Sequence, residues 1–385
     1  AITDAGFAAL TSTQLRGVAA GQLSGLTQTQ LQGLTSGAIK GLNAALFAPT
    51  SGLTTAQLQA LNSLSITGLS SAQLQGLSSN ITAIATEDFV GLASAQVGSL
   101  TDAQFALLST QQLAALTSVS MRGVTAAQLD SLDTTEIGAL ESVDLPGLTS
   151  TQLVTLDTAQ LQAFSDAQVA AAASGAVRAL SEAQYAALIG GVAAGSVNVT
   201  GLVSTQIGVL TTTQLSVSVL GALTSAQSLG LTTAQVDVLN VTQIAALNSA
   251  NIRGIPTQAI GVLDSTQVDA LTTSNIAGLS PTQLGGVSTA AVVGLHPHDI
   301  AVLASAQVGG LTTAQLDQLS GVQLRALTSV NIAGLSAAQL DAFGTDDIQA
   351  LGVEDVPGLR SAQLMSLDDT QLGAVTEAQL AALSS

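Results

Sequence analysis

The chain contains 385 residues, of which 47% are hydrophobic, 2% aromatic and 8% charged. Its 25 acidic residues exceed its 7 basic residues and give a net charge of −18, which disfavours nucleic acid and anionic membrane surfaces as partners because both attract basic proteins. The absence of Cys excludes disulfides, thiolate metal sites and thiol nucleophiles. Apolar runs are too short to span a bilayer, so we expect no membrane insertion.

An eight-residue repeat begins near the start of the chain. The apolar residues Leu10, Val18 and Leu26 stand eight residues apart, and the spacing continues to Leu383. The consensus octad is L-[ST]-x-x-Q-[LIV]-x-[GA], as in the copy LTTAQLDQ. No linker or change in composition interrupts it. We therefore predict a single continuous octapeptide-repeat solenoid over residues 1–385.

Each octad carries the signals of a short helix. Ser or Thr at position two and Gln at position five match the capping box, and the apolar residues at positions one and six match the hydrophobic staple. Gly or Ala at position eight is expected where the chain reverses, because Gly adopts a positive φ at little cost. A helix of one or two turns is unstable alone, so we expect neighbouring octads to bury its apolar face.

Two other folds compete with the short helices. In one continuous helix each octad would be offset by about 80°, so the Leu rows would never form a stripe. A three-sided β-solenoid is the alternative; Thr and Val favour it, whereas Leu, Ala and Gln oppose it. We favour an all-α repeat solenoid of very short capped helices, one per octad.

The register of the octads slips at four places. These lie near residues 43–52, 77–84, 188–202 and 218–223. Slips in a repeat array usually fall in loops or local bends, and we expect the same here.

A longer period is superimposed on the octads. Some octads have another residue in place of Gln at position five, and several of these start 24 residues apart, as at Leu116 and Leu140 or at Leu247 and Leu271. Spacings of 32 residues also occur. The 24-residue period predicts three octads per coil of the solenoid.

The two His residues of the chain lie together. His296, His298 and Asp299 could bind a metal. The octad register gives another explanation, in which His296 is the cap, Pro297 opens a helix and Asp299 takes the place of Gln. We therefore predict no metal site here.

Acidic pairs gather towards the end of the chain. They stand at expected helix starts, where carboxylates interact favourably with the helix dipole, and they are Asp346/Asp347, Glu354/Asp355 and Asp368/Asp369. The sequence lacks a calcium-loop motif. We expect a diffuse acidic surface that responds to divalent ions and no specific calcium site.

The sequence offers no constellation for catalysis. It contains no G-x-S-x-G, G-x-G-x-x-G or P-loop motif. Tyr185 and the Phe residues mostly occupy the apolar positions of octads, which indicates a core role. We predict that the chain is not an enzyme, with no catalytic residues and no cofactor.

The repeat resembles tracts of known proteins. The octads LTTAQLDQ, LSAAQLDA and VTEAQLAA resemble the L-T-x-x-Q-[LIV]-x-A tracts of large secreted bacterial surface and filament proteins, which are often Cys-free, acidic and exported by one-step secretion machinery. The resemblance implies an extracellular or cell-surface location and a structural, adhesive or filament-forming role. It carries no catalytic residue across.

The ends of the array suggest how it assembles. The array begins in register at Ile2 and stops just into an octad at Leu383, without a polar capping unit at either end, and free solenoids need such caps. We expect a piece of a longer protein or a subunit that stacks head to tail with itself into a filament, sheath or surface layer. The alternative is an adhesin stalk or ligand-binding module that recognises a cell surface or a glycan.

Overall fold

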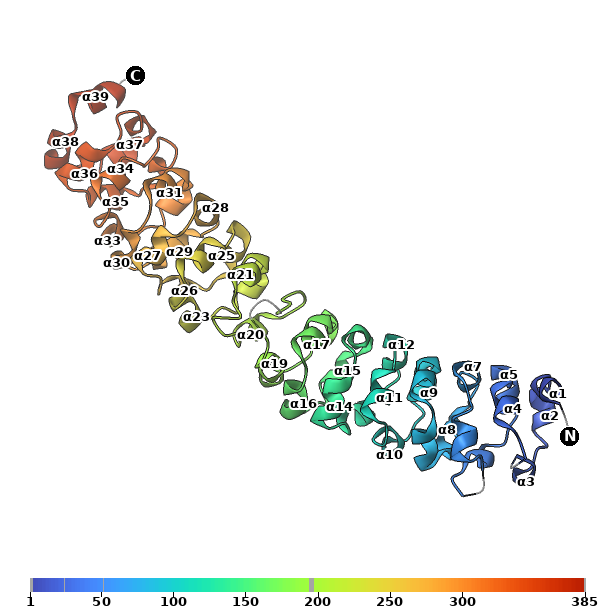
Figure 1. Ribbon diagram of the computed structural model, residues 1–385. Helices are drawn as coiled ribbons and strands as arrows, with labels where there is room; N and C mark the ends of the chain where they lie inside the picture. The colour runs from blue at the N-terminus through green and yellow to red at the C-terminus, as the bar shows by residue number, and fades with distance from the viewer. Residues whose placement is uncertain (1–2, 24, 51, 194–196, 384–385) are drawn as a thin grey trace. The chain divides into compact units, whose positions relative to one another are not determined.

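A computed structural model describes residues 3–23, 25–50, 52–193 and 197–383. The chain divides into two compact units, Ala1–Gly201 and Leu202–Ser385. Short helices make up both units, and no strand occurs among the described residues (Figure 1). The all-α fold class is therefore confirmed and the β-solenoid is wrong, while the single solenoid over residues 1–385 stays a prediction.

The helices of the first unit are α-helices (α) and 3-10 helices (η) of at most eight residues: α1 (Asp4–Ala8), α2 (Ser12–Leu15), α3 (Ala20–Leu23), α4 (Gln28–Gln32), α5 (Ser36–Ile39), η1 (Ala44–Phe47), α6 (Thr55–Leu58), α7 (Ser63–Ile66), α8 (Ser71–Gly76), η2 (Ser78–Ala83), η3 (Thr86–Gly91), α9 (Ser94–Val97), α10 (Asp102–Phe105), α11 (Thr110–Ala114), α12 (Ser118–Met121), α13 (Ala126–Asp130), α14 (Thr134–Ala139), η4 (Ser142–Gly147), α15 (Ser150–Leu153), α16 (Thr158–Gln162), α17 (Asp166–Ala171), α18 (Ser174–Val177) and α19 (Glu182–Ile189).

The helices of the second unit are equally short: α20 (Ser204–Ile207), α21 (Val217–Ala222), α22 (Ser225–Ser228), α23 (Thr233–Asp237), α24 (Val241–Ala245), α25 (Ser249–Gly254), α26 (Thr257–Ile260), α27 (Ser265–Asp269), α28 (Thr273–Ile276), α29 (Pro281–Gly286), α30 (Thr289–Val292), α31 (Pro297–Val302), α32 (Ser305–Val308), α33 (Thr313–Leu316), α34 (Gly321–Leu324), η5 (Ile332–Gly334), α35 (Ala337–Asp341), α36 (Thr345–Ala350), η6 (Val356–Gly358), α37 (Ser361–Leu364), α38 (Asp369–Ala374) and α39 (Glu377–Leu383).

The predicted capping box starts most of these helices. At α13, the hydroxyl of Thr125 accepts the N–H of Gln128 at 3.1 Å, and Oε1 of Gln128 accepts the N–H of Thr125 at 2.8 Å. Val124 and Leu129, at positions one and six, are buried. The core role of the aromatic side chains is confirmed as well, because all of them are buried: Phe7, Phe47, Phe89, Phe105, Phe164, Tyr185 and Phe343.

Removing one cap should destabilise its own helix. The hydroxyl of Thr312 accepts the N–H of Gln315 at 3.2 Å at the start of α33, and Thr312→Ala leaves that N–H only its 3.1 Å bond to the carbonyl of residue 312. We expect a loss of about 1 kcal/mol of local stability, which should accelerate amide hydrogen exchange at Gln315 roughly fivefold. Thr313→Ala at the exposed neighbouring position is the control and should leave this rate unchanged; equal acceleration by both variants would contradict the capping role.

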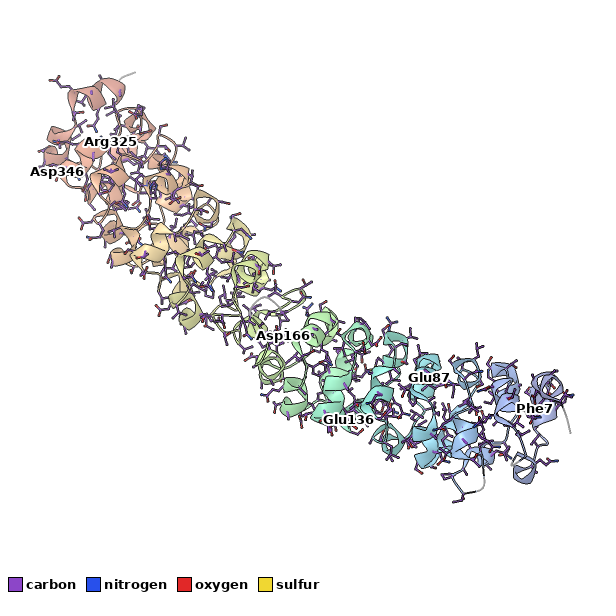
Figure 2. All side chains as sticks on the ribbon, viewed as in Figure 1. Phe7, Glu87, Glu136, Asp166, Arg325 and Asp346 are labelled. Carbon is purple, nitrogen blue, oxygen red and sulfur yellow. The ribbon has the colours of Figure 1, made fainter. Side chains whose placement is uncertain are left out.

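Elements three places apart in the chain pack on each other, so three octads make one coil. In the first unit α10 packs on α13, α13 on α15 and α15 on α18; in the second, α23 packs on α26 and α26 on α29. The predicted 24-residue coil is confirmed. Charged side chains such as Glu87 and Asp346 lie on the outside of the coils (Figure 2).

Gln at position five also joins each coil to the preceding coil. Nε2 of the buried Gln128 donates to the carbonyls of Val97 at 3.1 Å and Leu100 at 2.7 Å. Gln307 forms the equivalent two bonds in the second unit. One amide therefore caps its own helix and binds two carbonyls of the coil before it. We call this arrangement the glutamine clasp; the sequence analysis predicted its capping half alone.

Gly at position eight has a different role from the predicted one. Among the described glycines, Gly201 alone has a positive φ, of 85°, so chain reversal does not explain the others. A Cβ atom on Gly123 would lie 1.8 Å from the carbonyl oxygen of Ser94, and a Cβ on Gly334 would lie 1.8 Å from that of Ser305. Glycine is needed because the backbones of successive coils meet at this position.

The register slips have different structures. The slip at 43–52 contains η1, and the slip at 77–84 contains η2, in which Ser78 has a φ of 47°. The slip at 188–202 runs from the end of α19 to the unit boundary and includes residues 194–196, which lie outside the described residues. The slip at 218–223 lies mostly inside α21, so no loop forms over most of it.

The second unit repeats the octad order of the first unit at an offset of 211 residues. Asp144 in the segment DLPG corresponds to Asp355 in DVPG, and Ser118 corresponds to Ser329. Their contacts correspond too, because the carboxylates of Asp144 and Asp355 accept hydrogen bonds from the backbone N–H of Ser118 and Ser329, respectively. The two units therefore carry equivalent positions that can be compared directly.

Candidate functional site: a groove in each unit

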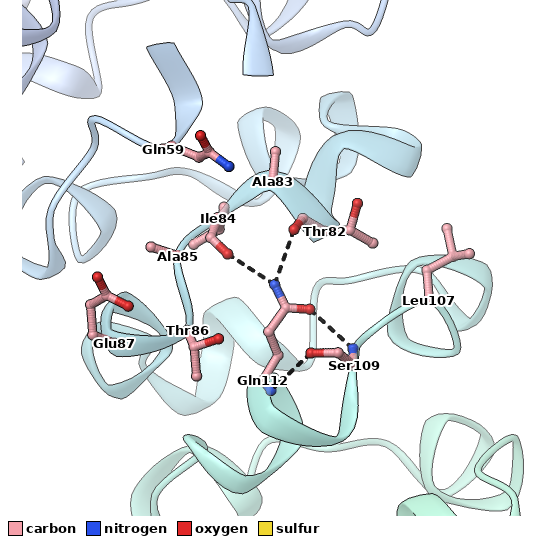
Figure 3. A pocket seen from close by; sticks show the side chains of 10 residues that line it. All are labelled: Gln59, Thr82, Ala83, Ile84, Ala85, Thr86, Glu87, Leu107, Ser109 and Gln112. Atoms are coloured by element: carbon pink, nitrogen blue, oxygen red, sulfur yellow. Dashed lines mark hydrogen bonds between the residues drawn. The ribbon is translucent and has the colours of Figure 1, made fainter. Parts of the chain in front are cut away.

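A groove of about 470 Å³ opens on the first unit beside the junction of η2 and η3 (Figure 3). Three successive coils supply its walls. The side chains that line it come from the end of α6, from the η2–η3 junction and from the start of α11: Gln59, Thr82, Ala83, Ile84, Ala85, Thr86, Glu87, Leu107, Ser109 and Gln112.

A glutamine clasp forms one side of this groove. Gln112 is buried; its Oε1 accepts the N–H of Ser109 at 3.0 Å, and its Nε2 donates to the carbonyls of Ile84 at 2.9 Å and Thr82 at 3.3 Å (Figure 3). The groove wall is therefore fixed before any ligand arrives.

The rim of this groove also carries polar groups that are available to a ligand. Gln59, Thr86 and Glu87 are exposed. Within the described part of the chain their side chains form no hydrogen bond to another residue. The rim thus offers an amide, a hydroxyl and a carboxylate.

The second unit has a groove of about 390 Å³ at the equivalent place. Ser320 and Gln323 line it and lie 211 residues after Ser109 and Gln112. Gln323 forms the same clasp, to the carbonyls of Leu295 at 2.7 Å and Val293 at 3.0 Å. The other lining residues of this groove are Asp269, Gly294, His296, Pro297 and Gln318.

Each groove adjoins an octad that lacks the clasp. Asp88 and Asp299 stand at position five of the octads that start at Ile84 and Leu295, and both side chains are buried. An ionised carboxylate has no N–H to donate, so neither side chain can bind the carbonyls of the preceding coil as Gln does.

Of the aspartates that stand at position five, burial raises the pKa of four. They form two equivalent pairs, Asp88 with Asp299 and Asp144 with Asp355. Desolvation is the largest cause in every case. Backbone N–H groups oppose the shift, as at Asp355, whose Oδ1 accepts from Ser329 N at 2.8 Å.

The raised pKa values predict that acid stabilises the coils. A carboxyl group whose folded-state pKa lies above its unfolded value of 3.8 stabilises the fold when protonated, and that contribution is lost as the pH rises through the folded-state pKa. We therefore expect the thermal midpoint to rise as the pH falls from 7 towards 4. Changing all four to Asn should raise the midpoint at pH 7 and flatten this profile, as natural Asn251 already donates to a coil carbonyl at 2.8 Å.

A matched control variant distinguishes the effect of carboxyl burial on the thermal midpoint from the effect of net charge. Four exposed acids that occupy neither position five nor an N-cap can be changed to Asn with the same change in net charge: Asp130, Asp237, Asp317 and Asp341. In this control the thermal midpoint should still rise as the pH falls from 7 towards 4. If it flattens the profile as much as the position-five variant does, general charge repulsion is the cause and the burial argument is wrong.

The His pair has the structure that the octad register predicts. His296 is the N-cap of α31 and accepts the N–H of His298, and Pro297 is the first helical residue. The two rings stack with centroids 5.0 Å apart, and their Nδ1 atoms lie 3.2 Å apart. Asp299 is buried beneath them. The described residues contain no group of three or more His, Cys, Asp or Glu arranged to hold a metal ion.

The acidic pairs near the end of the chain differ in role. Asp346 and Asp347 lie in the first turn of α36, and Asp368 caps α38, as predicted. Asp355 makes no cap for η6, because its carboxylate binds the N–H of Ser329 in the preceding coil. This pair also stands at a helix start, as predicted, because Asp355 occupies the N-cap position of η6.

Sequence reasoning missed the grooves because each draws its residues from three coils, whose octads are distant in the chain. The 211-residue offset was the available signal: it aligns Ser109 with Ser320, Gln112 with Gln323 and Asp88 with Asp299.

Comparison with known proteins identifies the repeat. Four segments match the ALTTAQ repeat family: residues 81–118, 137–171, 244–281 and 322–353. The chain is thus a repeat protein similar to ALTTAQ-repeat proteins over these segments. No curated protein matches it. None of the helices among the described residues has the length and apolar character needed to cross a membrane.

Proposed function

We propose that this chain is an extracellular structural protein whose solenoid assembles head to tail into a filament, sheath or surface layer. The glutamine clasp carries the proposal. One face of a coil presents Gln amides, and the opposite face presents the carbonyls that those amides bind, as between Gln128 and Leu100 or Gln307 and Leu279. Because the two faces are complementary at successive steps, one copy can continue the stack of another by a heterologous contact.

The composition supports the proposed location and class. The chain has no Cys and a net charge of −18, and its octads resemble those of large secreted bacterial surface proteins. We propose a structural and non-catalytic role, with the protein itself as the main partner.

Sedimentation velocity over a concentration series tests the assembly. We expect the mean sedimentation coefficient to rise with protein concentration, since head-to-tail contacts obey mass action. A constant coefficient at every concentration would reject self-assembly. Antibody labelling of intact producing cells tests location separately, and labelling that requires permeabilised cells would reject a surface role.

The alternative function is a ligand-binding module of an adhesin. The two equivalent grooves favour it, because each has an amide and a carboxylate exposed on the coil surface: Gln59 and Glu87 in the first, Gln318 and Asp269 in the second. A filament subunit can also carry such sites, so the two functions are compatible.

A further inference from the structure

We infer that the two grooves are equivalent binding sites for a neutral saccharide, one in each unit. This inference rests on the ligand-binding function proposed above and does not require head-to-tail assembly. Three features carry it: the equivalent place of the grooves in the two units, the set of chemical groups that both contain, and the charge of their linings.

The place of the grooves is repeated although their sequences have diverged. The clasp residues are the same, whereas Thr86 and Leu107 of the first groove correspond to Pro297 and Gln318 of the second. The hollow therefore depends on the arrangement of the coils and not on one particular lining side chain.

Both grooves bring together the same kinds of group from different positions. The first has the carboxylate of Glu87, the amide of Gln59 and the half-exposed aliphatic side chain of Leu107 (49% exposed). Ser109 adds a hydroxyl group beside them.

In the second groove Asp269 supplies the carboxylate, Gln318 the amide, Ser320 the hydroxyl and Val293 (46% exposed) the aliphatic surface. The second groove therefore presents the same set of groups as the first, on residues at different positions of the repeat.

This set of groups suits a polyol. A carboxylate accepts hydrogen bonds from two neighbouring hydroxyl groups, and an amide both donates and accepts. An aliphatic side chain can cover the C–H face of a sugar ring. Volumes of about 470 and 390 Å³ lie in the range of small-molecule sites.

The linings disfavour charged ligands. Neither groove is lined by Lys or Arg, so a phosphate, sulfate or acidic sugar would meet a carboxylate with no Lys or Arg to compensate it. Calcium takes six to eight oxygen ligands, whereas each groove supplies a single carboxylate. A neutral ligand rich in hydroxyl groups fits best.

Amide chemical-shift mapping by NMR can follow each groove separately. The probes are glucose, galactose, N-acetylglucosamine, maltose, lactose and chitobiose, titrated into the isotope-labelled full chain. We expect at least one of them to produce saturable shifts at the backbone amides of both Ser109 and Ser320. No saturable shift at either groove with any of the six sugars, or shifts confined to one groove, would overturn the inference.

Variants at exposed positions assign the contacts. Glu87→Gln should weaken binding about tenfold in the first groove alone, and Asp269→Asn should do so in the second alone, because each removes the charge from a charge-assisted hydrogen bond. Glu141→Gln and Asp341→Asn, at exposed acids outside the grooves, are the matched controls and should bind as the parent chain does. Binding that survives the double groove variant would overturn the assignment. Sedimentation velocity without sugar measures assembly alone, so a failure of assembly and a failure of sugar binding remain distinguishable.

Discussion

Replacing Gly123 with Ala should separate two coils of the first unit. The added Cβ would stand 1.8 Å from the carbonyl oxygen of Ser94 and 2.6 Å from its Cα. Backbone atoms cannot relieve this overlap by a change of rotamer, as a side chain could. We expect the free energy of unfolding to fall by about 3 kcal/mol or more, measured as a lower urea midpoint. Gly334→Ala should have the same effect in the second unit, where the equivalent contact is to Ser305.

Two other glycines provide the control. Gly175 in α18 and Gly373 in α38 have no atom within 4 Å of an added Cβ. Ala at these helical positions should stabilise the chain by about 0.5–1 kcal/mol. If the two contact variants and the two control variants change the midpoint equally, the close approach of the coils does not explain glycine at position eight.

Replacing Gln128 with Met should break one glutamine clasp while nearly preserving volume. The side chain is fully buried. Its loss leaves the carbonyl of Leu100 and the N–H of Thr125 without their partners, whereas the carbonyl of Val97 still accepts from the N–H of Leu100. At about 1–3 kcal/mol for each buried unpaired group, we expect a loss of about 2–4 kcal/mol in the free energy of unfolding.

A second variant separates the two halves of the clasp. Gln128→Glu keeps an oxygen that can accept the N–H of Thr125, since Glu also satisfies a capping box, but a carboxylate cannot donate to the coil carbonyls. It should destabilise the chain at pH 7 at least as much as the Met variant. Gln162→Met, at an exposed position in α16, is the control and should be nearly neutral. A Glu variant as stable as the parent would show that the bonds between coils contribute little.

The sequence predicted the local structure because its signals are local. Thr125 and Gln128 stand three residues apart, and Val124 and Leu129 five apart, so a single octad specifies the start and the buried face of its helix. The β-solenoid does not form because the capping and apolar contacts of the short helix repeat in octad after octad, whereas Thr and Val give only a weak preference for strands.

The contacts between coils could not be read from one octad. Gln128 binds carbonyls 28 and 31 residues earlier, and nothing in the local pattern identifies those partners. A signal was present nonetheless. Glu would serve a capping box as well as Gln, yet octads such as LTTAQLDQ and LTTAQVDV have Gln, and the amide donor is the difference between the two.

The role of glycine at position eight and the location of the grooves could not be predicted for a similar reason. A recurrent glycine has two physical explanations, a positive φ or a close backbone contact, and only the contact of Gly123 with Ser94 distinguishes them. The grooves are lined by side chains from three coils, so predicting them required knowledge of which octads are stacked.

Negative-stain electron microscopy of the purified chain over a concentration series tests the central proposal most directly. If coil faces join copies head to tail, filaments of uniform width should lengthen with concentration, and their density should repeat at roughly 8–10 Å per coil of packed helices. Isolated particles of constant size at every concentration would contradict head-to-tail assembly and would leave the ligand-binding module as the better account.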